Sequence, residues 1–558
     1  MCRNGLTFCG KENIISTTQP IKAIGNKKGD REMKHKRRPD PVAYSNLREI
    51  VLHAAEHFPD TRFFLGQDAA MPFVTGRELK ALCGAFGAWT QRRSLHGEHI
   101  AILGRNGAAW LSCFFAVICS GCVVVPLHLG TKPDELISCL ERSDSAALLY
   151  DESCSEDAAA LRSALPELET VSFSDLIGQL RREKDRAFPQ LHPDDLAALY
   201  FTSGTTARSR CVMLTHRNLG SQCSAAMSVL PLSAADSGLS ILPPSHTFEL
   251  VTNIVGTLHC GGTMYINESL LTVKENLRRL QPSIIVCVPL VLQTLAKEIR
   301  RTAKKQGRLE LLEKGMRLNG FLSRFGIDLS RRLFSEVYDV VGHNLRYFLC
   351  GGAALDPALV EFFRRLGITV LQGYGITECS PIVAANLPSA NRFGSIGRTF
   401  PSCETKLVDG EICVRGDSVS PGYYRDPEAT AEAYREGWFH TGDLGRIDRD
   451  GYLYFLGRRK NLIVLSNGEN VSPERLEEKL YRVEGVVDAV VYEANGKITA
   501  EVYADAAVLP DRNAVWQKID RVNSTLAQHE QIGALVLRDA PFEKTVTQKI
   551  KRYHEQEA

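Results

Sequence analysis

The segment Thr202–Arg210 concentrates side chains that could bind phosphate. Its nine residues, TSGTTARSR, include five hydroxyl side chains, one glycine and two arginines. A hydroxyl- and glycine-rich turn that follows a strand presents backbone N–H groups and O–H donors to an anion. The segment lacks the GxxxxGK[ST] pattern of a Walker loop, and a Ser/Thr-rich surface turn is an equal interpretation at this point. A strand, LAALYF, is expected before it and a helix after it, with Thr215 as the helix cap.

Short apolar runs alternate with helical patterns between about residues 45 and 400. The runs HIAILG, AALLYD, LAALYF and IIVCVP are each bounded by turn residues, and such alternation predicts parallel βαβ units. One unit can be followed completely. RYFLC is a strand, Asp356 caps a helix that starts at Pro357, and ITVLQGYG returns as the next strand.

The pattern changes after about Lys460. RLEEKLYRV has helical spacing, and VVDAVVYEANGKITAEVYAD contains two alternating runs joined by Asn495-Gly496, a strong hairpin signal. We therefore predict an α/β protein with a large N-terminal domain of βαβ-type sheets and flanking helices, residues 41–459, and a small C-terminal α+β domain, residues 460–558. Residues 1–40 are expected to form a basic, disordered tail.

Charge and cysteine usage favour a cytoplasmic protein that binds no nucleic acid. The chain of 558 residues has a net charge of only +2, although residues 1–40 carry ten Lys/Arg against four Asp/Glu. The sixteen cysteines lie mostly in apolar contexts, as reduced core residues do. Cys119 and Cys122 form one CxxC pair without a second pair at metal spacing, so we predict no zinc site there. The apolar segment 108–127 is interrupted by Gly121 and reads as a buried helix and a strand.

Four segments resemble motifs of the AMP-forming acyl-CoA synthetases, in the order and at about the spacing of that superfamily of adenylate-forming enzymes. They are YFTSGTTARSRCVMLTHRNL, LQGYGITECSP, GWFHTGDLGRIDRDGYLYFLGRRKNLI and EKTVTQKIKR. The resemblance extends from about residue 45 to the C-terminus. LSNGENVSPERLE is most similar to the long-chain fatty-acid branch.

The resemblance implies a two-step reaction. A carboxylate attacks the α-phosphate of ATP to give an acyl-adenylate and pyrophosphate, and the thiol of coenzyme A then displaces AMP. Such chemistry depends on positioning and on neutralising negative charge. The expected partners are a small-molecule carboxylic acid, namely a medium- or long-chain fatty acid, together with ATP, Mg²⁺ and coenzyme A, with at most peripheral membrane contact.

The resemblance also implies residue roles. Tyr374 would lie against adenine, Asp443 would accept hydrogen bonds from the ribose hydroxyls, and Arg458 would bind ribose or phosphate. Thr377 would donate to the α-phosphate and Glu378 would bind Mg²⁺ as a hard carboxylate ligand. The phosphate loop would contribute a larger set: Thr202, Ser203, Gly204, Thr205, Thr206 and Arg210.

Lys549 would bridge the carboxylate and the α-phosphate during adenylation, although a solvated basic tail is the alternative. The small domain would act as a lid that rotates about Lys460 between the two steps. Gly468 would then line the entry of the thiol. Gly351 and Gly352 would let the backbone approach adenine and the acyl carbonyl. His246 would gate the acyl pocket, or it is a structural histidine.

Four positions depart from the family pattern. Glycine is usual where Ala207, Cys211 and Gln548 stand, and lysine is usual at Arg210. Ala207 and Cys211 matter if those positions need a positive φ. We expect a working but slow enzyme. The alternatives are a ligase that loads the phosphopantetheine of an acyl carrier protein and a degenerate homologue that binds nucleotide or acyl groups without catalysis. A Rossmann dehydrogenase is disfavoured because GRNGAAW does not fit GxGxxG.

Overall fold

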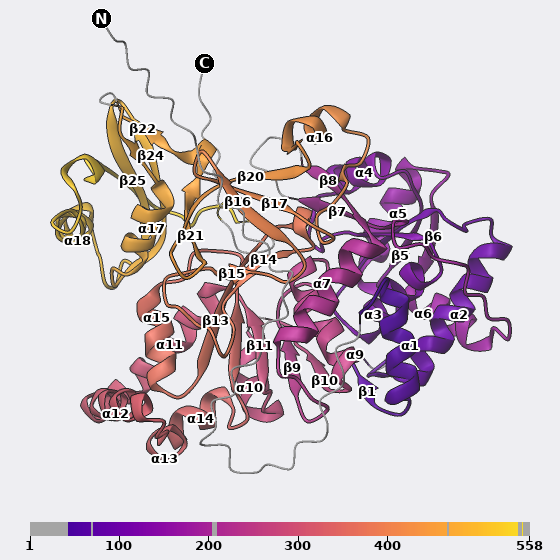
Figure 1. Ribbon diagram of the computed structural model, residues 1–558, viewed down its shortest axis with the longest axis horizontal. Coiled ribbons are helices and arrows are strands. Elements are labelled where there is room, and N and C mark those ends of the chain that lie inside the picture. Colours follow the sequence, from indigo (N-terminus) through magenta and orange to yellow (C-terminus); the bar gives the residue numbers. More distant parts are fainter. Residues whose placement is uncertain are drawn as a thin grey trace, which may run out of the picture.

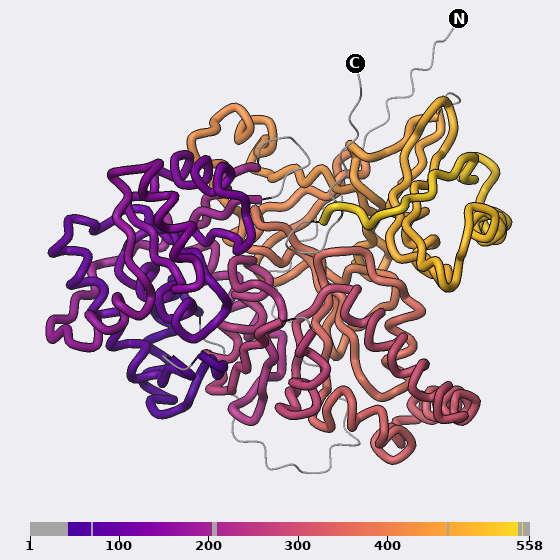
Figure 2. Tube along the Cα trace, turned by 180° about the vertical axis from the view of Figure 1, so that it is seen from behind, coloured from indigo at the N-terminus to yellow at the C-terminus, as the bar shows by residue number. Residues whose placement is uncertain are grey.

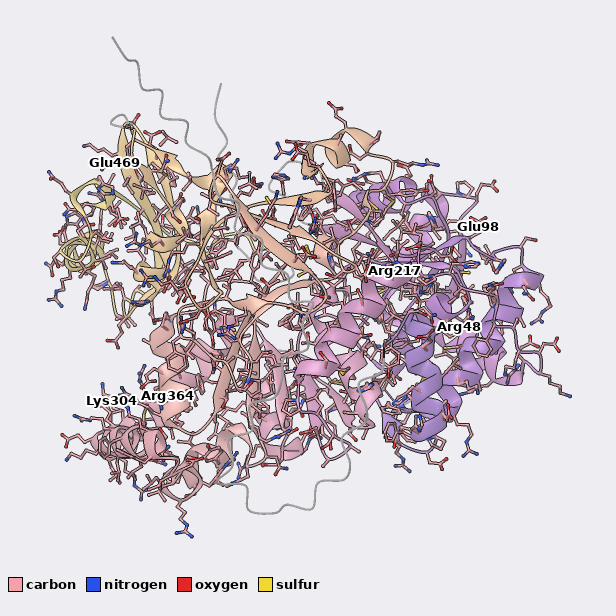
Figure 3. The ribbon with its side chains drawn as sticks, viewed as in Figure 1. Arg48, Glu98, Arg217, Lys304, Arg364 and Glu469 are labelled. Atoms are coloured by element: carbon pink, nitrogen blue, oxygen red, sulfur yellow. The ribbon has the colours of Figure 1, made fainter. Side chains whose placement is uncertain are left out.

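A computed structural model describes residues 43–68, 71–202, 209–269, 271–465, 468–544 and 550. Two large sheets with their helices make up most of it, and a smaller C-terminal unit lies beside them (Figure 1). The same arrangement is visible from behind, where the N-terminal half and the C-terminal unit lie at opposite ends of the molecule (Figure 2). Exposed charged residues occupy separate parts of the surface, among them Glu98, Lys304 and Glu469 (Figure 3).

The first large sheet has seven strands in the order β18-β8-β7-β4-β3-β5-β6. Strands β7, β4, β3, β5 and β6 are parallel, whereas β8 and β18 are antiparallel to their neighbours. Its strands are β3 (His99–Leu103), β4 (Val123–Pro126), β5 (Ser145–Tyr150), β6 (Glu169–Ser172), β7 (Leu196–Thr202), β8 (Arg210–Thr215) and β18 (Gly422–Tyr423). The associated helices are α1 (Leu47–His57), α2 (Gly76–Arg92), α3 (Ala108–Cys119), α4 (Pro133–Arg142), α5 (Ser155–Ala164), α6 (Phe173–Arg182) and α7 (His216–Val229).

Helix α3 shows why the apolar segment 108–127 does not behave as a membrane span. All twelve of its residues are buried, as expected for a helix that is apolar on every side. Gly121 then turns the chain with φ +82°, and β4 follows with all four residues buried. No helix in the described ranges is long and apolar enough to cross a membrane.

The second large sheet has twelve strands and two halves. Strands β10, β9, β11, β12 and β13 are parallel, and the remaining strands are antiparallel. The parallel half contains β9 (Ser237–Ser240), β10 (Thr263–Ile266), β11 (Ile284–Cys287), β12 (Tyr347–Cys350) and β13 (Thr369–Gly375). The antiparallel half contains β14 (Ile382–Ala385), β15 (Gly397–Thr399), β16 (Glu404–Val408), β17 (Glu411–Arg415), β19 (Tyr434–Arg435), β20 (Trp438–Ile447) and β21 (Tyr452–Arg458).

Helices between these strands include α8 (Thr247–Glu249), α9 (Gly256–Cys260), α10 (Val273–Leu280), α11 (Pro289–Lys305), α12 (Leu309–Leu322), α13 (Ser330–Leu333), α14 (Ser335–Val341), α15 (Pro357–Arg365) and α16 (Pro427–Ala433). A two-stranded sheet, β1 (Arg62–Phe63) with β2 (Val74–Thr75), lies near α1 and α2. The expected cap of α15 is present, because Asp356 accepts a hydrogen bond from the backbone N–H of Ala358 at 2.8 Å.

The C-terminal unit has a hydrophobic core of its own, whose buried members all lie between Ile463 and Leu535. Its elements are β22 (Ile463–Val464), β23 (Asn470–Val471), α17 (Pro473–Tyr481), β24 (Val486–Ala494), β25 (Lys497–Ala504), α18 (Arg512–Asn523) and β26 (Ala534–Arg538). The hairpin at Asn495-Gly496 is confirmed, since β24 and β25 pair in antiparallel fashion and both turn residues have positive φ. The ion pair between Arg482 and Asp356, with N–O 3.0 Å, joins this unit to the cap of α15.

One local expectation was wrong. The loop after β7 leads into a second strand, β8, and not directly into a helix. Strand β8 pairs antiparallel with β7, with Thr202 opposite Arg210. The helix α7 then begins where the sequence indicated, because the Thr215 side chain accepts from Asn218 N and Asn218 completes a capping box. The segment 203–208 therefore connects two adjacent strands.

Candidate nucleotide-binding site

The end of β13, the turn after it and the β20–β21 hairpin bring several of the predicted residues together. Asp443 is directly opposite Arg458 in the β20–β21 ladder, and Tyr374 lies near the end of β13. Thr377 and Glu378 follow in a short 3₁₀ turn, Thr377–Cys379. The ladder register therefore places the acidic and basic members of the site side by side.

Asp443 is held on both of its carboxylate oxygens. Tyr374 Oη donates to Oδ2 at 2.6 Å, and Arg458 Nε lies 3.1 Å from Oδ1. The residue is only 1% exposed, and its own N–H donates to Thr441 Oγ1 at 3.0 Å. Burial, together with the neighbouring Asp443, raises the pKa of Tyr374 well above its ordinary value. These protein contacts orient the carboxylate.

A second chain of contacts connects Glu378 with Arg210. Tyr423 Oη donates to Glu378 Oε1 at 3.0 Å, and Arg210 Nη1 donates to Tyr423 Oη at 3.2 Å. The Arg210 guanidinium also stacks over the Tyr423 ring at 4.9 Å and pairs with Glu432 at 3.5 Å. Burial raises the pKa of Glu378, while Arg210 and Arg458 act in the opposite direction. Tyr423 therefore links the Arg210 guanidinium to the Glu378 carboxylate.

Lys460 lies at the edge of the same group of charges, in the 3₁₀ turn Arg459–Asn461 that follows β21. Partial burial lowers its pKa first, and the nearby cations Arg458 and Arg210 lower it further, whereas Asp443 acts to raise it. The site thus gathers three cations, Arg210, Arg458 and Lys460, around two carboxylates.

Several predicted residues lie outside the described ranges: Ser203, Gly204, Thr205, Thr206, Ala207, Gln548 and Lys549. At the edge of the phosphate loop, the Thr202 side chain donates to Arg210 O at 3.5 Å. Cys211 is a buried strand residue without a positive φ, so the non-glycine residue there costs no backbone strain.

The two glycines after β12 have different constraints. Gly352 has φ +82°, a conformation that favours glycine. A Cβ on Gly351 would lie 3.2 Å from the Phe248 ring, so this ring packs directly against the backbone of the expected acyl site. Strand β12 neighbours β13, with Cys350 opposite Gln372, and the glycines consequently lie beside the strand that carries Tyr374.

His246 immediately precedes α8, and its ring lies 4.5 Å from the ring of His128. His128 Nδ1 is 2.9 Å from Ser245 Oγ, and burial lowers the pKa of His128 to about 4. Both histidine rings are half-buried, His246 shortly precedes Phe248 in the expected acyl segment, and the lowered pKa of His128 keeps that ring neutral near pH 7. Gly468, with φ +83°, lies in a loop of the C-terminal unit, where its N–H donates to Leu465 O at 2.8 Å; no described contact joins it to Asp443.

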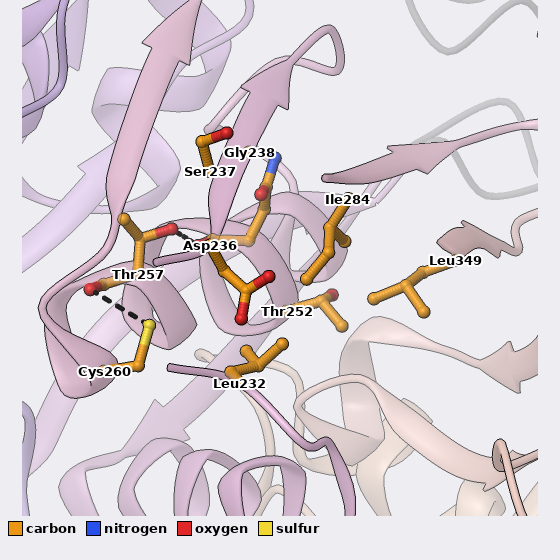
Figure 4. A pocket seen from close by; sticks show the side chains of 10 residues that line it. Leu232, Asp236, Ser237, Gly238, Thr252, Thr257, Cys260, Ile284 and Leu349 are labelled. Carbon is orange, nitrogen blue, oxygen red and sulfur yellow. Dashed lines mark hydrogen bonds between the residues drawn. The ribbon is translucent and has the colours of Figure 1, made fainter. Parts of the chain in front are cut away.

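A small cavity of about 20 Å³ lies beside the segment 243–262 and is shown in Figure 4. Asp236, Thr252, Thr257 and Cys260 contribute to its wall, together with the apolar Ile284 and Leu349. A volume of this size holds about one water molecule and no fatty-acid chain. It therefore does not represent the acyl pocket.

Two contributors were missed by the sequence reasoning. Tyr423 connects Arg210 to Glu378, as described above, and Glu411 Oε1 accepts from Gly442 N at 2.7 Å next to Asp443. Neither lies within a motif that singled it out. Both are found only when distant strands pair, because Tyr423 and Arg210 are 213 residues apart in the chain.

A family model described as AMP-binding enzyme matches residues 51–424. This chain belongs to that family. Long-chain-fatty-acid–CoA ligase 1 of Cavia porcellus is 28% identical over 467 residues, covering 75% of this chain and 66% of the ligase. A chloroplastic long-chain-fatty-acid–[acyl-carrier-protein] ligase, AEE15 of Arabidopsis thaliana, is 27% identical and covers 82% of this chain and 77% of its own length.

Solved structures of AMP-binding enzymes share the fold. The anthranilate CoA ligase AuaEII in complex with anthranoyl-AMP has a TM-score of 0.76 at 20% identity, covering 92% of this chain and 97% of that one. The o-succinylbenzoate coenzyme A synthetase of Bacillus subtilis, in complex with ATP and magnesium ion, has a TM-score of 0.73 at 24% identity, with coverage of 90% and 98%. The expected adenylate-forming fold is thereby confirmed.

Proposed function

We propose that this AMP-binding family member activates a medium- or long-chain fatty acid through acyl-AMP and transfers it to coenzyme A, with release of AMP and pyrophosphate. The observation that carries the proposal is the Asp443 carboxylate bound by Tyr374 and Arg458, with Arg458 also close enough to act on Glu378. A preorganised set of opposite charges is what adenylation needs, because it places and neutralises phosphate charge without reorganisation. The named fatty-acid ligase relatives support the choice of substrate class.

The residue roles follow from the contacts described above. Asp443 exchanges its Tyr374 hydrogen bond for the ribose hydroxyls, and the Tyr374 ring then packs against adenine. Thr377 donates to the α-phosphate, and Gly351 and Gly352 allow the acyl carbonyl and adenine to approach the backbone. Arg210 and the phosphate loop hold the β- and γ-phosphates.

Glu378 fits a Mg²⁺ ligand, because its donor atoms are carboxylate oxygens and one of them is oriented by Tyr423. Bound Mg²⁺ would neutralise phosphate charge. Arg210 and Arg458 lie close enough to act on the pKa of the same carboxylate, so this chain's own cations share that task.

The lid assignment remains part of the proposal. The large domain comprises residues 41–459 and the small domain residues 460–558, with Lys460 as the hinge. The separate core of the C-terminal unit supports a rigid rotating body. Rotation would exchange Lys549 for the loop that contains Gly468.

The Lys549→Ala variant tests the role of Lys549 directly: it should lose acyl-AMP formation yet still convert supplied acyl-AMP and coenzyme A to acyl-CoA. Equal loss of both half-reactions would contradict the assignment.

A carrier-protein ligase is the second candidate, because AEE15 carries that name and is matched over 77% of its own length, against 66% for the Cavia porcellus CoA ligase. Parallel assays with free coenzyme A and with a holo acyl carrier protein, each with a panel of fatty acids and with AMP as the readout, separate the two. Turnover with coenzyme A alone supports the first. ATP binding without turnover on either acceptor would identify a degenerate homologue.

The fourteen described cysteines are all free and buried, which supports a reducing compartment such as the cytoplasm.

A further inference from the structure

Glu411, Cys413 and His440 form a compact group on β17 and on β20, the strand that also carries Asp443. Glu411 and Cys413 are alternate residues of β17 and share one face of the strand. His440 is the direct partner of Cys413 on β20. Their potential ligand atoms all lie within 4.8 Å of one another. A cation could therefore contact all three.

The spacing of these atoms fits a tetrahedral ion. His440 Nδ1 lies 3.4 Å from Cys413 Sγ and 3.2 Å from Glu411 Oε2. Zinc bonds of about 2.3 Å to sulfur and about 2.0–2.2 Å to nitrogen or oxygen place tetrahedral ligands roughly 3.4–3.6 Å apart. The other oxygen of Glu411 accepts from Gly442 N at 2.7 Å, which orients the carboxylate as outer partners of metal ligands do.

The three side chains converge on one point. Nδ1 of His440 faces both the thiol and the carboxylate, and the thiol can also donate to the backbone oxygen of Glu411 at 3.8 Å. A metal ion at the centre would replace these hydrogen bonds by three direct bonds. His440 keeps 14% of its side-chain surface exposed, which leaves a route for an ion and its water ligand.

We propose that Glu411, Cys413 and His440 form a binding site for Zn²⁺ or a similar thiophilic divalent ion, with water as the fourth ligand. On binding, the Cys413 thiol releases its proton to solvent and sulfur bonds to the metal. Arg459 Nη2 lies 3.5 Å from Glu411 Oε2, so the metal competes with this contact. Because Arg459 adjoins Lys460 and Gly442 adjoins Asp443, occupancy should inhibit turnover; this consequence rests on the proposed function.

Metal binding should weaken as the pH falls, because a proton must leave the thiol. The charged and titratable groups that face the thiol from other elements are Lys406 on β16, Arg435 on β19, Arg459 on the turn after β21 and His440 on β20.

Cobalt titration of the full-length protein tests the site independently of activity. We expect one Co²⁺ per chain with a thiolate-to-cobalt absorption band, displaced by Zn²⁺. Cys413→Ser should lose the band, and His440→Asn should weaken binding by more than about 10-fold, since losing a direct ligand costs at least as much as losing an outer partner. Cys403→Ser is the matched control, because Cys403 is a buried thiol whose hydrogen-bond acceptors are the backbone carbonyls of Val383 and Phe400. Unchanged cobalt spectra and affinities in both Cys413→Ser and His440→Asn would overturn the site.

The effect of the bound metal on turnover is tested separately. Zn²⁺ should inhibit acyl-CoA formation by the wild type and not by Cys413→Ser, whose metal-free rate should match the wild type. Equal inhibition of the two proteins would overturn the coupling. A protein that binds cobalt as predicted but forms no acyl-CoA would contradict the proposed function and leave the metal site supported.

Discussion

At the scale of single residues, Asp443 shows how strongly the site is preorganised. One of its oxygens accepts a hydrogen bond from Tyr374 and the other pairs with Arg458. Asp443→Ala should lower kcat/KM for ATP by about 10–100-fold, because a charged hydrogen-bond partner is worth about 1.5–3 kcal/mol. Tyr374→Phe removes one hydroxyl only and should have a smaller effect. Steady-state kinetics with ATP varied would measure both, and an unchanged Asp443→Ala variant would exclude the ribose role.

Glu249 is a second residue whose chemistry can be tested. It is fully buried, burial raises its pKa to about 8, and Asn253 Nδ2 donates to its Oε1 at 2.8 Å. Because its folded-state pKa lies above the ordinary value of 4.5, the folded protein binds more protons than the unfolded chain between these values. The free energy of unfolding should therefore fall as pH rises from about 4.5 to 8, by a few kcal/mol.

Glu249→Gln removes this titration while keeping the side-chain shape. Urea unfolding at a series of pH values should show a flatter pH dependence for the variant than for the wild type. Parallel curves for the two proteins would mean that Glu249 is already ionised in the fold.

At the scale of elements, strand β13 contains two glycines whose replacement by alanine should affect stability differently. A Cβ on Gly375 would lie 2.2 Å from the Pro381 carbonyl oxygen, whereas one on Gly373 would lie 3.6 Å from Ala384 O. Gly375→Ala must shift the backbone that leads to Thr377 and Glu378, and should lower the free energy of unfolding by about 1–3 kcal/mol. Gly373→Ala is the matched control with ordinary contacts. Chemical denaturation compares them; equal stability of the two variants would contradict the close packing.

Local signals in the sequence were sufficient for several of the elements that were predicted. Asp356 and Thr215 capped helices where expected, and Asn495-Gly496 formed the hairpin. Strand β8 was missed because RCVMLT lies next to a loop read as leading into a helix. The antiparallel half of the twelve-stranded sheet was also not foreseen, since its order depends on pairing between distant segments. For the same reason, no spacing in the sequence singled out Tyr423 or the group formed by Glu411, Cys413 and His440.

At the scale of the whole molecule, the proposed two-step reaction depends on movement of the C-terminal unit. Lys460→Pro would fix φ at the hinge. We expect this variant to retain at least half of the pyrophosphate exchange of the wild type while thioester formation falls about 10-fold or more. The two half-reactions should be assayed separately in Lys460→Pro and in Lys460→Ala, which loses the same charge but leaves φ free. Lys497→Ala, at an exposed start of β25, is a suitable surface control. Equal effects of Lys460→Pro on both steps would argue against a hinge at this position.

The overall assembly was predictable from motif order, because the four segments recognised in the chain occur in the order of the family to which it belongs. The charge arrangement was only partly predictable. The sequence indicated Asp443, Arg458 and Glu378 as separate ligands, whereas the fold places them with Arg210 and Lys460 in one electrostatic group. Such coupling arises from strand register and burial, which no local pattern encodes.

Fatty-acid-dependent exchange of labelled pyrophosphate into ATP tests the central claim most directly, because it reports acyl-AMP formation without a thiol acceptor. We predict exchange that requires both a medium- or long-chain fatty acid and Mg²⁺ and that falls at least about 10-fold in Asp443→Ala. Absence of exchange by the folded, ATP-binding wild type with every carboxylic acid in the panel would contradict the account.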